Sequence, residues 1–298
     1  MKIVIAGGTG FLGKFLDEKF KSRGDEVIMI SRRNGDVVWT DADGLIRAVS
    51  GADLVINLSG KSVNCRYNEK NRNEILQSRT ETTRLLGEAV SKSTEPPKVW
   101  INSSTATIYR HAEDRPMTEE DGEIGNGFSV NVAKAWEKTF FDFELPETRQ
   151  IALRMAIVLG KDGGAMQPMT RLVRLGLGGK QGNGNQMFSW IHIEDIFQII
   201  LFLAGHKELQ GVFNCSAPNA VSNDRFMKTM RKVLHVHVGL PAPEWLLKIG
   251  AVLIGTETEL ILKSRWVEPR RLIDSGYKFV FPSLKPAIED ILTYEDRQ

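Results

Sequence analysis

Apolar residues follow two alternating patterns along the first 160 residues of the chain. In one pattern they form short runs rich in β-branched side chains, which is typical of strands buried on both faces. In the other they recur every three or four residues, as they do on the inner face of a helix. The runs predict strands at 2–8, 25–33, 36–39, 52–60, 97–105 and 149–160, and the periodic segments predict helices at 9–24, 43–50, 73–93 and 130–145.

This alternation predicts an α/β fold with a Rossmann-type, doubly wound parallel sheet. The glycine-rich segment 174–186 predicts a loop that serves as a hinge or lid. Beyond Ser222, helices and short strand-like pieces interrupted by prolines indicate a smaller C-terminal α/β lobe. We expect residues 1–160, with about 186–218, to form the cofactor domain, and residues 161–185 and 219–298 to form the substrate lobe.

The overall composition limits the classes of partner and the cellular compartment that we expect for this protein. The chain has 298 residues and a formal net charge of +2, which gives no reason to expect nucleic acid or an acidic membrane as a partner. Cys65 and Cys215 are too few and too far apart for a disulfide framework or a metal-ligand set. No apolar run reaches the roughly 18 residues of a membrane helix. We expect a cytoplasmic protein that acts on a small molecule.

A glycine-rich turn, GGTGFLG, follows the first expected strand and opens a helix, with three glycines at three-residue spacing. In such a turn the first glycine permits a tight bend, the second lets a pyrophosphate approach the backbone, and the third lets helix and strand pack closely. The helix start supplies free N–H groups for the phosphates. The alternative is a glycine-rich turn without a ligand. The cofactor contacts predicted here are Gly7, Thr9, Gly10, Phe11, Leu12 and Gly13.

The end of the second expected strand indicates which nicotinamide cofactor is preferred. A site for NAD usually places Asp or Glu there, to accept hydrogen bonds from the ribose. This chain has Ser31, Arg32 and Arg33 instead, and guanidinium groups pair with a 2′-phosphate. The sequence therefore predicts NADP as the cofactor. The alternative is a solvated basic turn.

Small residues follow the fourth and fifth expected strands. Leu58, Ser59 and Gly60 end the fourth strand, and Ser103 lies near the end of the fifth. Ligands of open α/β sheets bind at the carboxyl edge of the strands. We expect these four residues to contact the cofactor, because small side chains let it lie flat against the backbone.

Several motifs together resemble the extended short-chain dehydrogenases/reductases. They are AGGTGFLG, NLSG, NSSTATIY and the helix that holds AWE. The blocks NLSGKSV, ILQSRTETTRLL, FSVNVAKAWE and GNGNQMFSWIHIEDI are similar to one atypical branch, whose members are called epimerase-family or nucleoside-diphosphate-sugar-epimerase-like proteins. The resemblance runs from Met1 to about Leu292. It implies an NADP(H)-dependent oxidoreductase or epimerase.

The resemblance also implies a catalytic Ser or Thr together with a Tyr and a Lys four residues apart, which exchange a proton with the substrate. Thr105 falls on the Ser/Thr position. With Glu137 as the anchor, Ser129 takes the Tyr position and an alanine takes the Lys position; a shift of one residue places Lys134 at the Lys position but restores no tyrosine. The branch as a whole lacks this pair.

A substitute proton donor has to come from the four tyrosines of the chain. Tyr277 and Tyr294 lie in the C-terminal lobe, and Tyr67 lies in the loop after the fourth strand. Tyr109 follows Thr105 by four residues and is the better substitute by position. The alternative is that Tyr109 packs under the substrate loop.

Further residues are candidate substrate contacts. Arg79 is an additional candidate, with bracing of its own helix as the alternative. We expect no metal site, since His192 and the acids after it alternate faces and lack a third ligand. The predicted substrate contacts are Arg66, Tyr67, Gln186, Ser189 and Trp190.

Two functions remain open. The first is an NADP(H)-dependent oxidoreductase or epimerase that acts on a carbonyl or secondary alcohol, with a nucleotide-sugar-like molecule as one substrate class. The second is an NADPH-binding sensor or scaffold, which the missing Tyr–Lys pair favours. A homodimer through the helix that holds Trp136 is a further expectation, with burial of Trp136 in the core as the alternative.

Overall fold

A seven-stranded sheet, parallel throughout, forms the centre of the computed structural model, which describes residues 1–255 and 257–293. The strand order is β11-β6-β5-β4-β1-β2-β3. The strands are β1 (Lys2–Ala6), β2 (Glu26–Ser31), β3 (Val37–Val38), β4 (Leu54–Asn57), β5 (Val99–Thr105), β6 (Arg149–Met155) and β11 (Gly211–Cys215). This confirms the Rossmann-type fold, and β11 adds a strand that the hydrophobic pattern did not predict.

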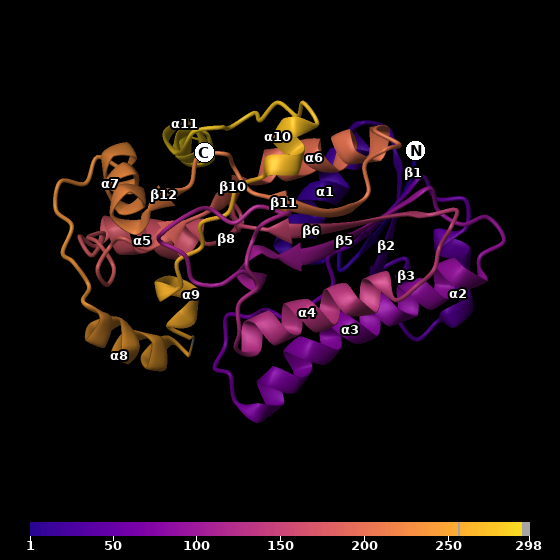
Figure 1. Cartoon of the computed structure of the whole chain (residues 1–298), viewed down its shortest axis with the longest axis horizontal. Coiled ribbons are helices and arrows are strands. Elements are labelled where there is room, and N and C mark those ends of the chain that lie inside the picture. Colours follow the sequence, from indigo (N-terminus) through magenta and orange to yellow (C-terminus); the bar gives the residue numbers. More distant parts are fainter. Residues whose placement is uncertain (256, 294–298) are drawn as a thin grey trace.

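Helices cover both faces of the sheet (Figure 1). One face carries α1 (Phe11–Ser22), α6 (Ile193–Gly205) and α10 (Arg270–Asp274), and the other carries α2 (Ala42–Val49), α3 (Glu69–Lys92) and α4 (Phe128–Phe141). Successive residues of β1 alternate between two apolar cores. Ile3 and Ile5 pack with Phe20 of α1 in the first core, whereas Val4 packs in the second core, on the opposite face of the sheet. Burial on both faces is why the strands read as continuous apolar runs.

The strand order reverses between β1 and β4. From β1 the chain proceeds to β2 and β3 on one side, and then returns to β4 on the other side. The register pairs Ala6 with Asn57, so the carboxyl ends of the two strands are level. In doubly wound sheets this switch point is where a crevice opens for a ligand. Both the glycine-rich turn after β1 and the small residues after β4 therefore lie at this switch point.

The expected strand at 149–160 is wrong as a single element, because it is divided at Ala156. Ala156 N donates a hydrogen bond to Cys215 O (3.0 Å), whereas Ile157 N donates to Ser189 O (3.2 Å). The backbone thus changes partners within two residues and leaves the central sheet. The second part, β7 (Ile157–Gly160), forms a separate sheet with β8 (Gly163–Gly164) and β10 (Trp190–His192).

A smaller group of elements packs around a third apolar core that includes Trp190, Phe226 and Ile288. Figure 1 shows α5, α7 and α8 grouped beyond the carboxyl edge of the central sheet. The elements are α5 (Met166–Arg174), β9 (Met187–Phe188), β12 (Val221–Ser222), α7 (Asn223–Val233), α8 (Glu244–Ile254), α9 (Glu259–Leu262) and α11 (Leu284–Thr293). The C-terminal part is not confined to this lobe, since Leu272 and Tyr277 pack in the first core.

The glycine-rich segment between α5 and β9 is an irregular loop tied to the strand-like segment before α8. Gly179 N donates to Leu240 O (3.1 Å), and Gly182 N donates to Ala242 O (2.8 Å). Its role as a hinge or lid stays a prediction. Tyr294 lies outside the described residues. Within the described part of the chain, no helix is long and apolar enough to span a membrane.

Candidate functional site

The glycine-rich turn brings the ends of β1 and β4 into close contact. Gly7 has a φ of +78°, and a Cβ placed on it would lie 2.8 Å from Ser59 N. A Cβ on Gly13 would lie 2.4 Å from Gly8 Cα, so the start of α1 packs directly on the turn. A Cβ on Gly10 would meet only Gly7 O, at 3.6 Å, and backbone there is open to a ligand. The three glycines thus have the geometry that their spacing predicts for a tight bend, an open backbone and close helix packing.

The first turn of α1 is open to an anion. Its N-cap is Gly10, which offers no side-chain cap, and the first turn contains no acidic residue. Thr9 and Gly10 are exposed. The Phe11 ring packs beside Gly160 and Gly163, and Leu12 packs against the first core, so both side chains serve packing. The backbone N–H groups of these residues belong to the first turn of the helix, where they have no partner within the helix and can donate to an anion.

Two exposed arginines follow β2. Gly7 N donates to Ile30 O (2.9 Å), which ties this strand end to the glycine turn. Ser31 Oγ accepts a hydrogen bond from Asn34 N (3.1 Å) and shapes the turn. Within the described part of the chain, no carboxylate forms an ion pair with Arg32 or Arg33. Both guanidinium groups are therefore available to a phosphate bound beside the turn.

A buried polar network fixes the ends of β4 and β5. Asn57 Nδ2 donates to Asn102 Oδ1 (2.7 Å) and to Thr83 Oγ1 (3.0 Å), and Asn57 Oδ1 accepts from Ser59 N (3.0 Å). Trp136 of α4 donates from Nε1 to Thr83 Oγ1 (3.0 Å), which places its indole in the core. Each group is satisfied, so the network holds the backbone of both strand ends in one position.

A cavity of about 210 Å³ opens above this network. Of the residues that the sequence predicts, it brings together Leu58, Ser59, Gly60, Tyr67, Ser103, Thr105 and Ser129. The Ser59 hydroxyl is buried without a hydrogen-bond partner among the described residues. Thr105 Oγ1 accepts a hydrogen bond from Thr107 N (3.2 Å), so its O–H can still donate to a ligand. Sequence reasoning missed Trp136 and Phe128 as lining residues, because their helical spacing indicates only a core face.

Tyr67 lies beside Ser129, the residue that one register of the resemblance aligns with the family's tyrosine. It enters from the segment between β4 and α3, and its ring packs edge-on against Phe128 with centroids 5.0 Å apart. Burial raises the pKa of the Tyr67 phenol above its ordinary value, and a hydrogen bond with the Ser129 hydroxyl opposes part of that rise. Ser129 Oγ in turn donates to Glu259 Oε2 (3.1 Å). The phenol of Tyr67 and the hydroxyl of Ser129, which come from different elements, are thus paired in one hydrogen-bonded network.

Tyr109 and Lys134 are not among the residues that line the cavity. The Tyr109 hydroxyl is buried, donates to Asn214 Oδ1 (2.9 Å) and accepts from Arg154 Nη1 (2.8 Å). Arg154 also forms a pair of hydrogen bonds with Glu137 (2.8 and 2.7 Å). This placement favours the packing role for Tyr109. Lys134 is exposed on α4.

The other candidate substrate contacts also lie apart from the cavity. Ser189 Oγ donates to Arg265 O (2.8 Å) and accepts from Val267 N (2.8 Å), and Trp190 Nε1 donates to Asn219 O (3.2 Å). Gln186 Nε2 donates to Gln181 O (2.9 Å). These three side chains are buried and hold the second lobe together. Arg66 forms an ion pair with Glu257 (3.4 Å) beside Tyr67.

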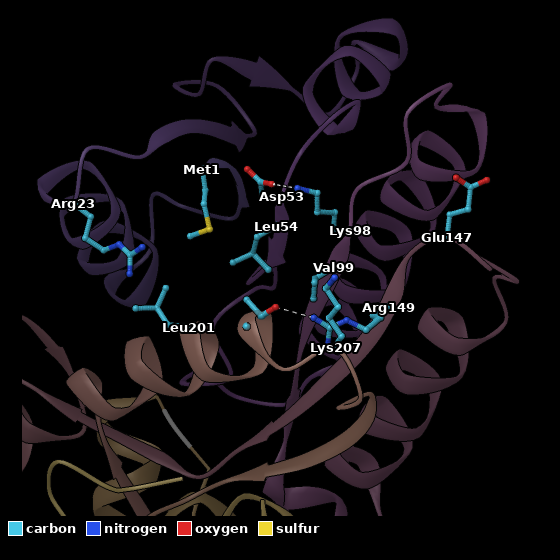
Figure 2. A pocket seen from close by; sticks show the side chains of 12 residues that line it. Met1, Arg23, Asp53, Leu54, Lys98, Val99, Glu147, Arg149, Leu201 and Lys207 are labelled. Carbon is cyan, nitrogen blue, oxygen red and sulfur yellow. Dashed lines mark hydrogen bonds and ion pairs between the residues drawn. The ribbon is translucent and has the colours of Figure 1, made fainter. Parts of the chain in front are cut away.

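A larger cavity, about 630 Å³, lies at the opposite, amino edge of the sheet (Figure 2). Lys98 pairs there with Asp53 (2.6 Å), and Arg149 donates to carbonyl oxygens of Leu203 (3.2 Å) and Ala204 (2.9 Å) at the end of α6. These contacts join the amino ends of β4 and β5 to each other and β6 to the end of α6. Because ligands of doubly wound sheets bind at the carboxyl edge, we assign function to the smaller cavity.

Comparison with known proteins places the chain in a family. The model described as "NAD dependent epimerase/dehydratase family" matches residues 3–216, and the one described as "Domain of unknown function (DUF1731)" matches residues 242–291. The epimerase family protein SDR39U1 of Homo sapiens is 33% identical over 98% of this chain and 100% of its own length. The epimerase family protein YfhF of Bacillus subtilis is 32% identical over 98% of each chain.

Solved structures agree with this assignment. The crystal structure of human SDR39U1 with NADPH superimposes with a TM-score of 0.88 at 33% identity, over 98% of this chain and 99% of that one. A nucleoside-diphosphate sugar epimerase from Corynebacterium glutamicum gives a TM-score of 0.78 at 27% identity, over 98% of this chain and 58% of that one. The chain therefore belongs to the NAD dependent epimerase/dehydratase family, in the branch of the SDR39U1-like epimerase family proteins.

Proposed function

We propose that this protein is an NADP(H)-dependent oxidoreductase or epimerase that acts on a carbonyl or a secondary alcohol. The observation that carries the proposal is the junction of two features at the switch point of the sheet. An anion-binding glycine turn stands beside Arg32 and Arg33, and a cavity lined by the hydroxyl groups of Thr105 and Tyr67 lies beyond Ser59. The first feature suits a dinucleotide, and the second suits a reacting oxygen.

The choice of NADP rests on charge and on a relative. An exposed pair of arginines without an ion-pair partner in the described part of the chain suits a 2′-phosphate, which a carboxylate at this position would repel. Human SDR39U1, 33% identical, crystallised with NADPH. Gly7, Gly10 and Gly13 would hold the pyrophosphate, and Ser59 and Ser103 would contact the nicotinamide half.

The cavity residues can carry the acid–base part of such a reaction. NADPH, when bound, supplies the hydride that adds to a carbonyl carbon. Thr105 donates a hydrogen bond to the carbonyl oxygen, and Tyr67 gives its phenolic proton to that oxygen as it becomes an alcohol. The Tyr67 phenol is protonated at neutral pH, as a donor must be; burial raises its pKa and makes it a weaker acid, and the hydrogen bond with Ser129 opposes part of that effect. Ser129 links the phenol to Glu259, whose partly exposed carboxylate offers a proton route to solvent.

A sensor or scaffold that binds NADPH without turnover is the second candidate. The observation in its favour is that the resemblance aligns either Ser129 and Ala133, or Val130 and Lys134, with the Tyr and Lys of family enzymes, and neither register contains a tyrosine. The cavity argues against it, since a sensor has no need of a pocket lined by hydroxyl groups next to the cofactor. Loss of a general acid lowers a rate by about 10²–10⁴ without abolishing the reaction.

The remaining expectations belong to this proposal. Residues 1–160 and about 186–218 would hold the cofactor, with 161–185 and 219–298 as the substrate lobe, apart from the segment with Leu272 and Tyr277, which packs in the first core. Nucleotide sugars are one substrate class within it. Cys65 and Cys215 are both free thiols, which suits the reducing cytoplasm. A homodimer is proposed through exposed faces of α3 and α4 rather than through Trp136, which is buried.

The proposal is tested by titrating the protein with NADPH and then following NADPH fluorescence with a panel of simple aldehydes and ketones. We expect stoichiometric binding of NADPH and slow oxidation by at least one member of the panel. Transfer of deuterium from C4-labelled NADPH to the product separates enzymatic from spontaneous oxidation. Tight NADPH binding with no deuterium transfer to any compound would support the sensor instead.

A further inference from the structure

Helix α8 exposes an apolar face to solvent. Trp245, Ile249 and Val252 lie four and three residues apart, so they form one stripe along the helix, and Trp245 is 64% exposed. Ala251 is buried on the other side of the helix. The one acidic and the one basic residue of α8 pair with each other (2.9 Å). A helix that is apolar on all sides is normally covered, so the exposed stripe is expected to have a partner.

The stripe continues into the loop segments that lead to α8. Leu240 N donates a hydrogen bond to Gly176 O (2.8 Å), and a Cβ on Gly176 would lie 4.0 Å from Val238 Cγ1. The segment after α5 and the segment before α8 therefore lie side by side. Of the fourteen large apolar side chains that are exposed in the described part of the chain, eight lie within 175–177, 238–240 and 245–252. We call these three segments the apolar patch, and such a concentration indicates an interaction site.

The part of the chain that carries the apolar patch is basic. Residues 166–186 and 222–254 contain eight lysines and arginines but two acidic residues, which gives them a net charge of +6. Because the whole chain carries +2, the remainder carries −4. The small overall charge, which gives no reason to expect an acidic membrane as a partner, is thus the average of a basic lobe and an acidic remainder. Such a lobe attracts an anionic partner.

A cleft of about 440 Å³ beside the apolar patch collects several of these basic residues. Its charged and imidazole-bearing lining residues are Arg174, Lys232, His235, Lys285 and Glu289. Lys285 pairs with Glu289 (3.1 Å), whereas Lys232 forms no ion pair with a carboxylate in the part of the chain that the structure describes. Arg174 directly precedes the apolar patch in the sequence. Cations next to exposed apolar side chains suit the phosphate of a lipid headgroup whose acyl chains lie alongside.

The charge of the lobe disfavours a second copy of the chain as the partner. In a two-fold symmetric interface the same surface of each copy faces the other, so the basic residues of both copies would oppose one another. Figure 1 shows α8 at the periphery of the molecule, away from the central sheet. An outer helix with an exposed tryptophan among aliphatic residues has the composition of helices that lie in a lipid interface.

We propose that the apolar patch docks this protein on the surface of a membrane that contains anionic lipids, with α8 lying in the interface. The apolar side chains enter the boundary between headgroups and acyl chains, and the basic residues around the cleft contact the headgroups. This docking requires no helix that spans the bilayer. It is independent of the proposed oxidoreductase function, because none of the residues involved lines the cavity above β4 and β5.

The test is sedimentation of the full-length protein with vesicles of phosphatidylcholine that contain about 30% phosphatidylserine, and with vesicles of phosphatidylcholine alone. We expect at least tenfold stronger binding to the anionic vesicles. Trp245→Ala should weaken that binding about 10- to 100-fold, because it removes a large apolar side chain from the interface. Lys232→Gln should weaken it about fivefold. Brominated acyl chains should quench the fluorescence of the wild-type protein more than that of Trp245→Phe.

Two substitutions outside the apolar patch are the matched controls. Lys92→Gln removes an exposed lysine from the last turn of α3, as Lys232→Gln does from the last turn of α7. Phe141→Ala removes an exposed aromatic side chain at the end of α4. Both should leave vesicle binding unchanged. The thermal unfolding midpoint of each variant shows that it is folded.

Four outcomes would overturn the proposal. The first is failure to bind anionic vesicles, or equal binding to both kinds of vesicle. The second is full binding by Trp245→Ala, which would indicate adsorption by charge alone. The third is a dimer in sedimentation equilibrium that Trp245→Ala dissociates, which would assign the apolar patch to a second copy. The fourth is retention on polyglutamate without binding to vesicles, which would assign it to an acidic protein.

Discussion

Replacement of Arg32 and Arg33 by alanine should remove the preference for NADPH. Both side chains are exposed on the turn after β2, so water screens each contact with a 2′-phosphate. An exposed ion pair contributes at most about 1 kcal/mol. Two such contacts amount to about 2 kcal/mol, which corresponds to an NADPH affinity about 30-fold weaker in the double variant. NADH carries no 2′-phosphate, and its affinity should change by no more than about twofold.

Calorimetric or fluorescence titration with both cofactors, at low and high salt, measures this effect. The difference between wild type and double variant should shrink at high salt, because exposed charges are screened there. Arg47→Ala is the control, since Arg47 is an exposed arginine of α2 that pairs at 3.6 Å with Asp41. An NADPH-to-NADH affinity ratio that is the same in wild type and the double variant would refute the assignment of the phosphate site.

Three other substitutions test the local structure of the site. Gly7→Ala places a methyl group 2.8 Å from Ser59 N at a φ of +78°, and it should lower the unfolding free energy by about 2 kcal/mol or more and abolish NADPH binding. Gly24→Ala is the control. Gly24 has a φ of +83° with open space around it, so this variant should lose only about 1 kcal/mol of unfolding free energy through backbone strain. Asn57→Ala removes three buried hydrogen bonds and leaves Ser59 N without its partner, and it should cost about 2–4 kcal/mol in urea unfolding; a loss under 1 kcal/mol would contradict the network. Burial lowers the pKa of Lys263 to about 8, below its value in the unfolded chain. Between about pH 8 and 10.4 the unfolded state therefore binds more protons than the folded state, and the unfolding free energy should rise with pH across that window. Lys263→Met should remove a rise on the order of 2 kcal/mol from the pH profile, and identical slopes in the two proteins would disprove it.

The fold and the geometry of the glycine turn could be predicted from the sequence because they depend on local patterns. The strands are buried on both faces, and the glycine turn follows directly from three glycines at three-residue spacing within one strand–turn–helix unit. The division at Ala156 could not be read in the same way. Residues 151–160 are apolar except for Arg154 and carry no turn signal at Ala156, and only the partners of Ala156 N and Ile157 N show where the chain leaves the sheet.

The substrate half depends on contacts between segments that are distant in the sequence. Tyr109 is closer to Thr105 along the chain, but the turn after β5 directs its hydroxyl to Arg154 and Asn214. Tyr67 is brought to Ser129 only by packing of the loop after β4 against the start of α4. Sequence spacing has no information about such a contact, which is why it favoured Tyr109.

The central claim is that hydroxyl groups of this chain complete a hydride transfer although the family's tyrosine is absent. The most direct measurement is a single-turnover test of protein loaded with NADPH or with NADP⁺, in which fractionated small metabolites are added and nicotinamide fluorescence is followed. We predict that one fraction changes the signal, that Thr105→Val and Tyr67→Phe each slow the change by about 10²–10⁴, and that Tyr109→Phe does not. A silent signal from both cofactor forms, with the cofactor shown to be bound, or full rates in both Thr105→Val and Tyr67→Phe, would contradict the claim.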